Sequence, residues 1–268
     1  GIQKARTDFS VDGNADGNPA AYTKDDIVVA VIDTGIDIKH QDLDAGKVIG
    51  WKDFVNNKTT PYDDNNHGTH VAGMAAGEGQ ANPSFTGVAP RAALVGVKVL
   101  NSSGSGTVSR VISGIDWVVA NKATFGVEII NLSLGTSGCS SGTDSLSQAV
   151  NNAVSQGIAV TVSAGNSGPG TCTIGSPAAA AGAITVGAMA DVWEKGFYLA
   201  AFSSRGPTLD GRIKPDVLAA GVAITAPRRG TTTSYIALSG TSMASPFVAG
   251  TAALMLNKNP ALTPSQVK

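Results

Sequence analysis

Residues 26–35 read DIVVAVIDTG, and this stretch decides the fold class of the chain. The nearly continuous apolar run from Asp26 to Ile32 is typical of a strand that is buried on both faces, and the polar turn Asp33-Thr34-Gly35 ends it. Four similar β-branched runs follow, at residues 93–100, 127–133, 158–163 and 183–187, and helical patterns lie at residues 69–76, 108–121, 144–156 and 243–256. This alternation predicts an α/β fold: a three-layer sandwich with a mostly parallel central sheet and helices on both faces.

The composition bounds the class of protein. Of the 268 residues 42% are hydrophobic, which excludes a disordered chain. The 19 basic and 20 acidic residues are balanced, so neither a nucleic-acid partner nor a polybasic membrane anchor is expected. No apolar run approaches the length of a membrane span, so no membrane partner is expected either.

No repeat or linker divides the chain, so residues 1–268 are predicted to form a single domain. Residues 1–25 precede the first strand and are predicted to form a surface extension or loop. We also expect that the chain is a processed product, because it begins at Gly1 without an apolar leader. C-terminal residues are expected to be missing, because the helix announced by Thr263 and Pro264 has barely one turn.

Polar residues stand where several of the predicted strands end. Asp33, Ser133 and Asn166 each close or follow an apolar run. The carboxyl ends of parallel strands carry the functional groups in this kind of sheet, so these side chains are candidates for a site. Taken alone, Asp33 is equally a turn residue that caps a loop.

Residues 67–73 read HGTHVAG and contain two of the three histidines. Both could ligate a metal together with Asp63 or Asp64, but no second His or Cys cluster completes such a site. The alternative is one catalytic base, His70, on the first turn of a helix.

Residues 239–250 read SGTSMASPFVAG and place Ser242 at the start of a long apolar helix. An N-cap serine is the simpler interpretation, but it does not explain Pro246 or the surrounding small residues. Those features suit a serine that a substrate approaches closely. A serine hydroxyl is a weak nucleophile, so it needs a base, and the base needs an orienting carboxylate.

Three segments together resemble the signature motifs of the subtilisin-like serine peptidases: residues 33–35 (DTG), 67–73 (HGTHVAG) and 240–246 (GTSMASP). Residues 202–208, 210–212 and 214–216 resemble the bacterial and archaeal branch of that family. The resemblance extends from about Ile27 to Lys268. It implies that Ser242 is the acylating nucleophile, His70 the general base and Asp33 the orienting carboxylate. It also implies that Asn166 is the side-chain donor of the oxyanion hole, although a plain turn residue is the alternative.

The resemblance further implies a site for an extended polypeptide substrate. Two edge segments would pair with the substrate backbone, and small residues would line the primary specificity pocket. These residues are Gly104, Ser105, Gly106, Ser133, Leu134, Gly135, Gly165 and Gly175. A pocket without charge at its base, at Gly175, should prefer large apolar side chains with broad tolerance. Ordinary turn chemistry is the alternative for the glycines.

The resemblance therefore implies a secreted serine endopeptidase that needs no cofactor for catalysis. It would be a monomer whose own propeptide, absent from this chain, assists folding and inhibits the enzyme. A catalytically silent relative that binds peptides is the alternative function. His40 has no matching role and is expected at the surface.

Two structural features are predicted besides the site. An exported protein meets an oxidising environment, so Cys139 and Cys172 are expected to form a disulfide, with two buried free thiols as the alternative. Residues 12–17 (DGNADG) fit the start of a calcium loop, with oxygen ligands from Asp12, Asn14 and Asp16. A turn that binds nothing is the alternative there, because the expected Glu at position twelve is Thr23.

Overall fold

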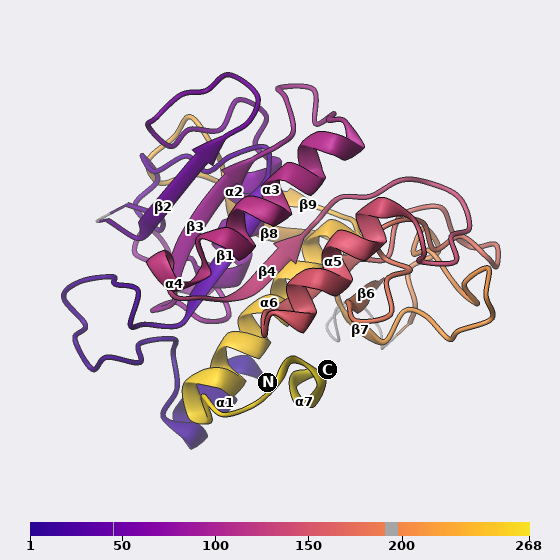
Figure 1. Cartoon of the computed structure of the whole chain (residues 1–268). Helices are drawn as coiled ribbons and strands as arrows, with labels where there is room; N and C mark the ends of the chain where they lie inside the picture. The colour runs from indigo at the N-terminus through magenta and orange to yellow at the C-terminus, as the bar shows by residue number, and fades with distance from the viewer. Residues whose placement is uncertain (45, 191–197) are drawn as a thin grey trace.

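A parallel sheet of seven strands forms the centre of the molecule, in the order β2-β3-β1-β4-β5-β6-β7 (Figure 1). The computed structural model describes residues 1–44, 46–190 and 198–268. The strands of this sheet are β1 (Val28–Asp33), β2 (Val48–Asp53), β3 (Ala93–Lys98), β4 (Val127–Leu132), β5 (Ala159–Ser163), β6 (Ile184–Met189) and β7 (Val217–Ala220). A separate antiparallel hairpin consists of β8 (Ile224–Pro227) and β9 (Tyr235–Leu238).

Helices cover both faces of the sheet. In chain order they are α1 (Ile2–Phe9), α2 (His67–Ala76), the short 3₁₀ turn η1 (Pro83–Phe85), α3 (Val108–Ala120), α4 (Lys122–Phe125), α5 (Ser145–Ser155), α6 (Thr241–Lys258) and α7 (Pro264–Val267). Figure 1 shows α3, α4 and α5 on one side of the sheet and α2 and α6 on the other. The prediction of a three-layer α/β sandwich is thereby confirmed.

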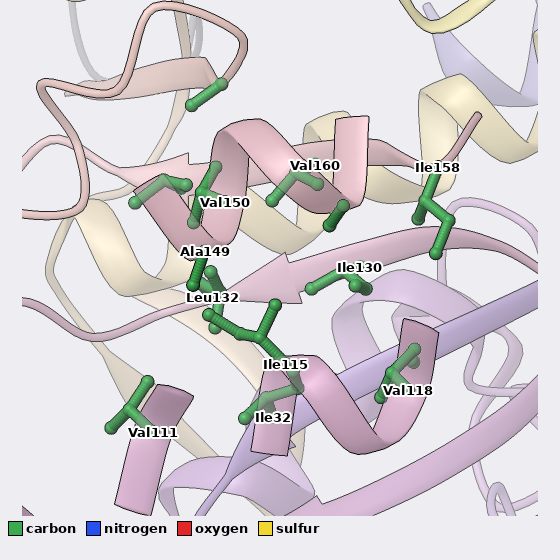
Figure 2. Packing of buried hydrophobic residues seen from close by; sticks show 14 of the residues in the cluster. Ile32, Val111, Ile115, Val118, Ile130, Leu132, Ala149, Val150, Ile158 and Val160 are labelled. Carbon is green, nitrogen blue, oxygen red and sulfur yellow. The ribbon is translucent and has the colours of Figure 1, made fainter. Parts of the chain in front are cut away.

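Successive side chains of β1 point to opposite faces of the sheet and contribute to two separate cores. Val28 and Ile32 point into the cluster under α3 and α5, whereas Val29 and Val31 point into the cluster under α2 and α6. A strand that is buried on both faces is apolar at successive positions, so residues 27–32 do not alternate between apolar and polar side chains. In the first core the side chains of Ile32, Ile115 of α3 and Leu132 of β4 lie together (Figure 2).

The strand order places the site. β1 pairs with β3 on one side and with β4 on the other. β2 and β3 therefore lie to one side of β1 and the later strands lie to the other, so the strand order reverses at β1. Such a reversal of strand order opens a crevice at the carboxyl ends of the strands. Asp33 ends β1 and Ser133 follows β4, so both residues lie at this crevice.

The sequence patterns missed the less buried elements. β2 is an edge strand whose residues are mostly half-buried, and β7, at the other edge, is partly exposed. Neither strand has the continuous apolar run of a central strand. The predicted N-terminal loop in fact contains α1, and the backbone N–H groups of Asp12 and Gly13 both donate to Oδ1 of Asn257 on α6.

Candidate active site

Asp33 is a fully buried carboxylate at the end of β1. Its Oδ1 accepts hydrogen bonds from the backbone N–H of Thr34, at 2.7 Å, and from Nδ1 of His67, at 2.8 Å. The second oxygen lies 3.0 Å from the same His67 nitrogen. Burial of a charged group is costly unless it is paired, and these contacts supply the pairing. Asp33 is therefore more than a turn residue.

His67, not His70, is the histidine that contacts Asp33, so the prediction that His70 fills this position is wrong. His70 lies one helical turn further along α2 and is fully buried. Its Nε2 lies 3.0 Å from the carbonyl of Ile224 and 3.1 Å from that of Ile236, both on the β8–β9 hairpin. His70 is thus a structural side chain that joins the helix to the hairpin.

The first turn of α2 is docked onto the turn after β1. Thr34 accepts a hydrogen bond from the backbone N–H of Gly68, at 2.9 Å, and donates its own hydroxyl to Asp63, at 3.0 Å. A Cβ at Gly68 would lie only 2.1 Å from the carbonyl oxygen of Gly35. Only glycine permits this approach, and the approach sets the residue just before Gly68 against Asp33. Gly68 agrees with this packing, but it is the folded structure that shows His67, and not His70, at Asp33.

The pKa values of the two histidines are shifted in opposite directions. Burial alone would lower the pKa of His67, but the charge of Asp33 and its hydrogen bond outweigh burial and raise the pKa above 6.5. Burial lowers the pKa of His70 to about 4, because the two backbone carbonyls compensate only in part. At neutral pH His70 is therefore uncharged. The His67 side chain, in contrast, is 27% exposed to solvent.

Ser242 occupies the first turn of α6, at the same crevice. Its hydroxyl donates to the carbonyl oxygen of Ser133, at 3.2 Å, and the Ser133 hydroxyl donates back to the Ser242 carbonyl, at 2.8 Å. Beneath this pair, Nδ2 of the buried Asn131 donates to the Ser133 hydroxyl, at 3.0 Å. The Asn131 side-chain oxygen accepts from Thr161 and Ser245. This buried network fixes β4, β5 and α6 relative to one another.

Asn166 is an exposed residue on the loop after β5, and its orientation is fixed by Thr241. Oδ1 of Asn166 accepts from both the backbone N–H and the hydroxyl of Thr241, each at 3.0 Å. The amide NH₂ therefore points away from Thr241. Gly165 has φ +105°, and a Cβ there would lie 2.8 Å from the Ser204 hydroxyl, so the loop requires glycine at this position.

The two predicted edge segments line one groove of about 500 Å³ beside His67. We call it the long groove; Gly104, Ser105 and Gly106 lie on one wall, after β3, and Ser133, Leu134 and Gly135 lie on the other, after β4. A second cavity of about 240 Å³, the small pocket, is lined by Gly165, Asn166, Gly175 and Ser242 among others. Gly135 lines both cavities, so they adjoin.

Gly175 is packed against the wall of the small pocket. A Cβ at this position would lie 1.8 Å from the Thr136 carbonyl oxygen, so no larger residue fits without movement. The backbone N–H of Thr136 donates to the carbonyl of Ser176 at 2.7 Å, which holds the two segments together. Cys139 and Cys172 form the predicted disulfide near these segments, with Cα atoms 5.0 Å apart.

Lys98 is a site residue that the sequence did not reveal. Its ammonium group is fully buried and donates to the carbonyl oxygens of Thr34 and Leu100 and to the carboxylate of Asp64, at 2.5, 2.8 and 2.6 Å. It thereby ties the turn after β1 to the chain that leaves β3 for the long groove. A lysine in a strand otherwise made of apolar residues is the only local sign of this role.

The predicted calcium loop is closed by its own hydrogen bonds. Asp12, Asn14 and Asp16 each accept a backbone N–H from a residue two or three positions ahead, and Asp16 also accepts the Thr23 hydroxyl. Over the described residues, no group of three or more His, Cys, Asp and Glu side chains could hold a metal ion. Calcium at this loop remains a prediction.

His40 is buried, so the expectation of a surface position is wrong. Its Nε2 lies 3.0 Å from the carbonyl of Ser234, and its ring meets Tyr235 edge-on at a centroid distance of 5.1 Å. Loop residues without apolar periodicity gave no indication of this packing.

In the described part of the chain, no helix has the length and apolarity to cross a membrane.

Comparison with known proteins agrees with this geometry. The family model described as "Subtilase family" matches residues 24–268. The chain is 44% identical over 273 residues to "Serine protease AprX" of Bacillus subtilis (strain 168), which covers 94% of this chain and 61% of that protein. It is 44% identical over 249 residues to "Subtilisin DY" of Bacillus licheniformis, which covers 92% of this chain and 82% of the relative.

Two solved structures are similar in fold. "Sphericase" superposes with a TM-score of 0.77 at 34% identity, over 98% of this chain and 86% of the other. A "cold adapted subtilisin-like serine proteinase" superposes with a TM-score of 0.74 at 36% identity, over 92% and 81%. The fold and the site define the class, a subtilisin-like serine peptidase. The chain belongs to the subtilase family.

Proposed function

We propose that the chain is a serine endopeptidase that cleaves polypeptides through an acyl-enzyme on Ser242. The observation that carries this proposal is the 2.8 Å hydrogen bond between Asp33 and His67, at the crevice that also holds Ser242. Asp33 orients the imidazole and stabilises its protonated form, and His67 is the general base and acid. This replaces His70 in the role that the sequence suggested.

Acylation starts with a rotation of the Ser242 side chain. The hydroxyl, which donates to the Ser133 carbonyl, turns toward His67 and gives its proton to Nε2 while Oγ attacks the substrate carbonyl carbon. The rotation also releases the Ser133 carbonyl, which becomes an acceptor for a substrate N–H. The imidazolium then protonates the leaving amine, the peptide bond breaks, and an ester on Ser242 remains. Water attacks the ester with His67 again as the base.

Two donors are proposed for the developing oxyanion. The backbone N–H of Ser242 lies in the first turn of α6, where N–H groups have no partner within the helix. The second donor is Nδ2 of Asn166, whose direction is set by the bonds from Thr241 to Oδ1. Loss of one such donor typically lowers kcat by about 10²–10³-fold.

Substrate specificity is proposed from the linings of the two cavities. The long groove offers backbone edges at residues 104–106 and 133–135 for pairing with an extended substrate. The described residues that line the small pocket are all uncharged, which favours a large apolar residue before the scissile bond. Broad tolerance is expected because the backbone pairing is independent of sequence.

Further properties are proposed from the family resemblance. The enzyme is secreted, in agreement with the disulfide, which persists in oxidising surroundings. It is made with a propeptide that assists folding and inhibits the site, and it acts as a monomer. Calcium, if bound at Asp12, Asn14 and Asp16, is structural, and catalysis needs no cofactor.

Labelling with a fluorophosphonate tests the proposal. The reagent should modify Ser242, as mapped by mass spectrometry, and the protein should hydrolyse casein. A Ser242→Ala variant should do neither and should still bind peptides in the long groove. A catalytically silent relative would bind peptides but show no label and no hydrolysis in the wild type. An adduct on another residue would contradict the assignment of the nucleophile.

A further inference from the structure

A third cavity, the arginine pocket, shares His67 with the long groove, but the β8–β9 hairpin, which does not line the groove, supplies most of its other residues. It has a volume of about 510 Å³ and is lined by two groups of residues. Asn65, Asn66 and His67 come from the start of α2, and Arg228, Arg229 and their neighbours come from the β8–β9 hairpin. His67 and Asn65 line both this pocket and the long groove, so the two cavities adjoin at the histidine.

The position of the arginine pocket assigns it to the departing part of the substrate. The part that acylates Ser242 occupies the long groove and the small pocket, which share the wall at Leu134 and Gly135. The amine that leaves is protonated by His67. A chain that continues past the scissile bond therefore passes His67 and enters the cavity beyond it, which contains Arg228 and Arg229.

Charged side chains are distributed unequally among the three cavities. Within residues 1–44, 46–190 and 198–268, no Lys, Arg, Asp or Glu lines the long groove or the small pocket. Among the described residues, the lining of the arginine pocket contains two guanidinium groups and no Asp or Glu. The site is thus neutral on the acyl side of the scissile bond and cationic on the leaving side.

Three hydrogen bonds hold the backbone of the arginine pocket in place. The N–H of Arg229 donates to Oδ1 of Asn66, at 2.8 Å, and the N–H of Gly230 donates to the carboxylate of Asp37, at 2.6 Å. The N–H of Arg228 donates to the Ser234 carbonyl across the hairpin, at 2.9 Å.

The arginine side chains themselves are available to a ligand. Arg228 and Arg229 are exposed, and neither enters an ion pair within the described residues. Two guanidiniums on a positioned backbone present several N–H donors that match the geometry of a carboxylate.

We propose that Arg228 and Arg229 form a cationic subsite that selects acidic side chains among the first three residues after the scissile bond. The inference rests on the proposed endopeptidase function and adds a substrate preference to it. Exposed charge pairs are individually weak, so we expect about a threefold to tenfold advantage in kcat/KM for Glu over Gln. Since mobile ions screen such pairs, the advantage should shrink between 0.01 and 1 M salt, over which the Debye length falls from about 30 to 3 Å.

Internally quenched peptides test the subsite. One series keeps an identical apolar sequence before the scissile bond and places Glu, Gln or Lys at each of the three following positions in turn. The Glu to Gln ratio of kcat/KM is compared between the wild type and Arg228→Gln/Arg229→Gln. Lys4→Gln/Lys24→Gln is the matched control, because it removes the same two charges from exposed positions that line none of the three cavities.

The possible outcomes test this subsite separately from the proposed endopeptidase function. The inference predicts a ratio above one in the wild type and the control, and a ratio near one in the arginine variant. A ratio near one in the wild type at low salt, or a preference that survives the arginine substitutions, overturns it. A peptide anilide, which has no residue after the scissile bond, reports the proposed function separately. Wild-type hydrolysis of the anilide without a Glu preference rejects only the subsite.

Discussion

His67 and His70 lie three residues apart on α2, and their surroundings differ. Residues at i and i+3 lie on the same helix face, so spacing alone does not tell which of them meets Asp33. The distinction comes from depth, because His67 begins α2 at the crevice whereas His70 lies one turn deeper. Only His67 meets a carboxylate, and only His70 meets two backbone carbonyls.

Substitution of the two histidines should give unequal losses. His67→Ala should lower kcat by about 10⁶-fold, the size known for the corresponding loss in subtilisin. His70→Gln keeps an N–H donor for the two carbonyls and should retain acylation by a fluorophosphonate. Rates on a peptide anilide, with circular dichroism to verify folding, measure the difference. A large loss in folded His70→Gln with an active His67→Ala would reverse the assignment.

The buried His70 should also make the fold sensitive to acid. Its pKa is about 4 in the folded chain against 6.5 in a model peptide, so the unfolded chain binds more protons between these values. Stability is then complete above pH 6.5 and is lost as the pH falls toward 4, by at most about 3 kcal/mol.

Urea titrations of Ser242→Ala at pH 7 and pH 4.5 measure this loss without self-digestion. Adding His70→Gln to that variant should reduce the difference between the two pH values. An equal difference with and without His70 would assign the acid sensitivity to the carboxylates.

At the scale of elements, the loops that build the site are held by contacts distant in sequence. The disulfide joins the segment after β4 to the segment before Gly175, across 33 residues. Both segments line the small pocket or its rim. This crosslink therefore restrains the pocket as well as the unfolded chain.

Removing the disulfide should destabilise the protein. For a loop of this length the chain-entropy model gives about 3–4 kcal/mol. Cys139→Ser/Cys172→Ser should unfold at a lower temperature, and its KM for apolar substrates should rise because the pocket wall loosens. Calorimetry and steady-state kinetics measure the two effects. Two titratable thiols in the unreduced, denatured wild type would contradict the crosslink.

The loop around Asp12 should respond to calcium if it is a site. Binding to the folded state alone stabilises that state by mass action, so chelation should lower the melting temperature. Asp12→Ala/Asp16→Ala should lower it too and shrink the effect of the chelator. Asp8→Ala is the control, since Asp8 is an exposed carboxylate on α1, close to the loop in the sequence but outside the predicted ligand set. An unchanged calcium stoichiometry in the double variant would exclude this loop.

At the scale of the whole molecule, the central sheet joins two cores into one unit. β1 contributes alternate side chains to both, so loss of one core exposes the back of the other. This continuity supports the prediction that residues 1–268 form a single domain, and it implies one unfolding transition.

A core substitution tests this cooperativity. Ile115→Ala in the core of Figure 2 should lower the free energy of unfolding by about 2–5 kcal/mol and keep a single transition. Leu209→Ala, at a position that is 67% exposed, should change it by less than about 0.5 kcal/mol. Urea unfolding of both variants on the Ser242→Ala background measures the shifts. Two separate transitions would reject the single-domain prediction.

The amino-acid sequence is sufficient to predict the layers, the buried strands and the segments that surround the crevice. These follow from local properties: continuous apolar runs mark strands buried on both faces, and polar residues at their ends mark the open edge of the sheet. The disulfide was also predicted correctly, and the two predicted edge segments lie together along the long groove. Edge strands and the β8–β9 hairpin were missed because partly exposed strands have no such run.

The histidine that meets Asp33, and the cavity next to it, could not be predicted from the sequence. That choice depends on how closely α2 docks onto the turn after β1, which the contacts at Gly68 and Thr34 set. The arginine pocket likewise brings Arg229 to Asn66 across 163 residues. Such contacts depend on the packing of whole elements, and no local pattern of residues encodes the distance between side chains that the chain brings together only when it folds.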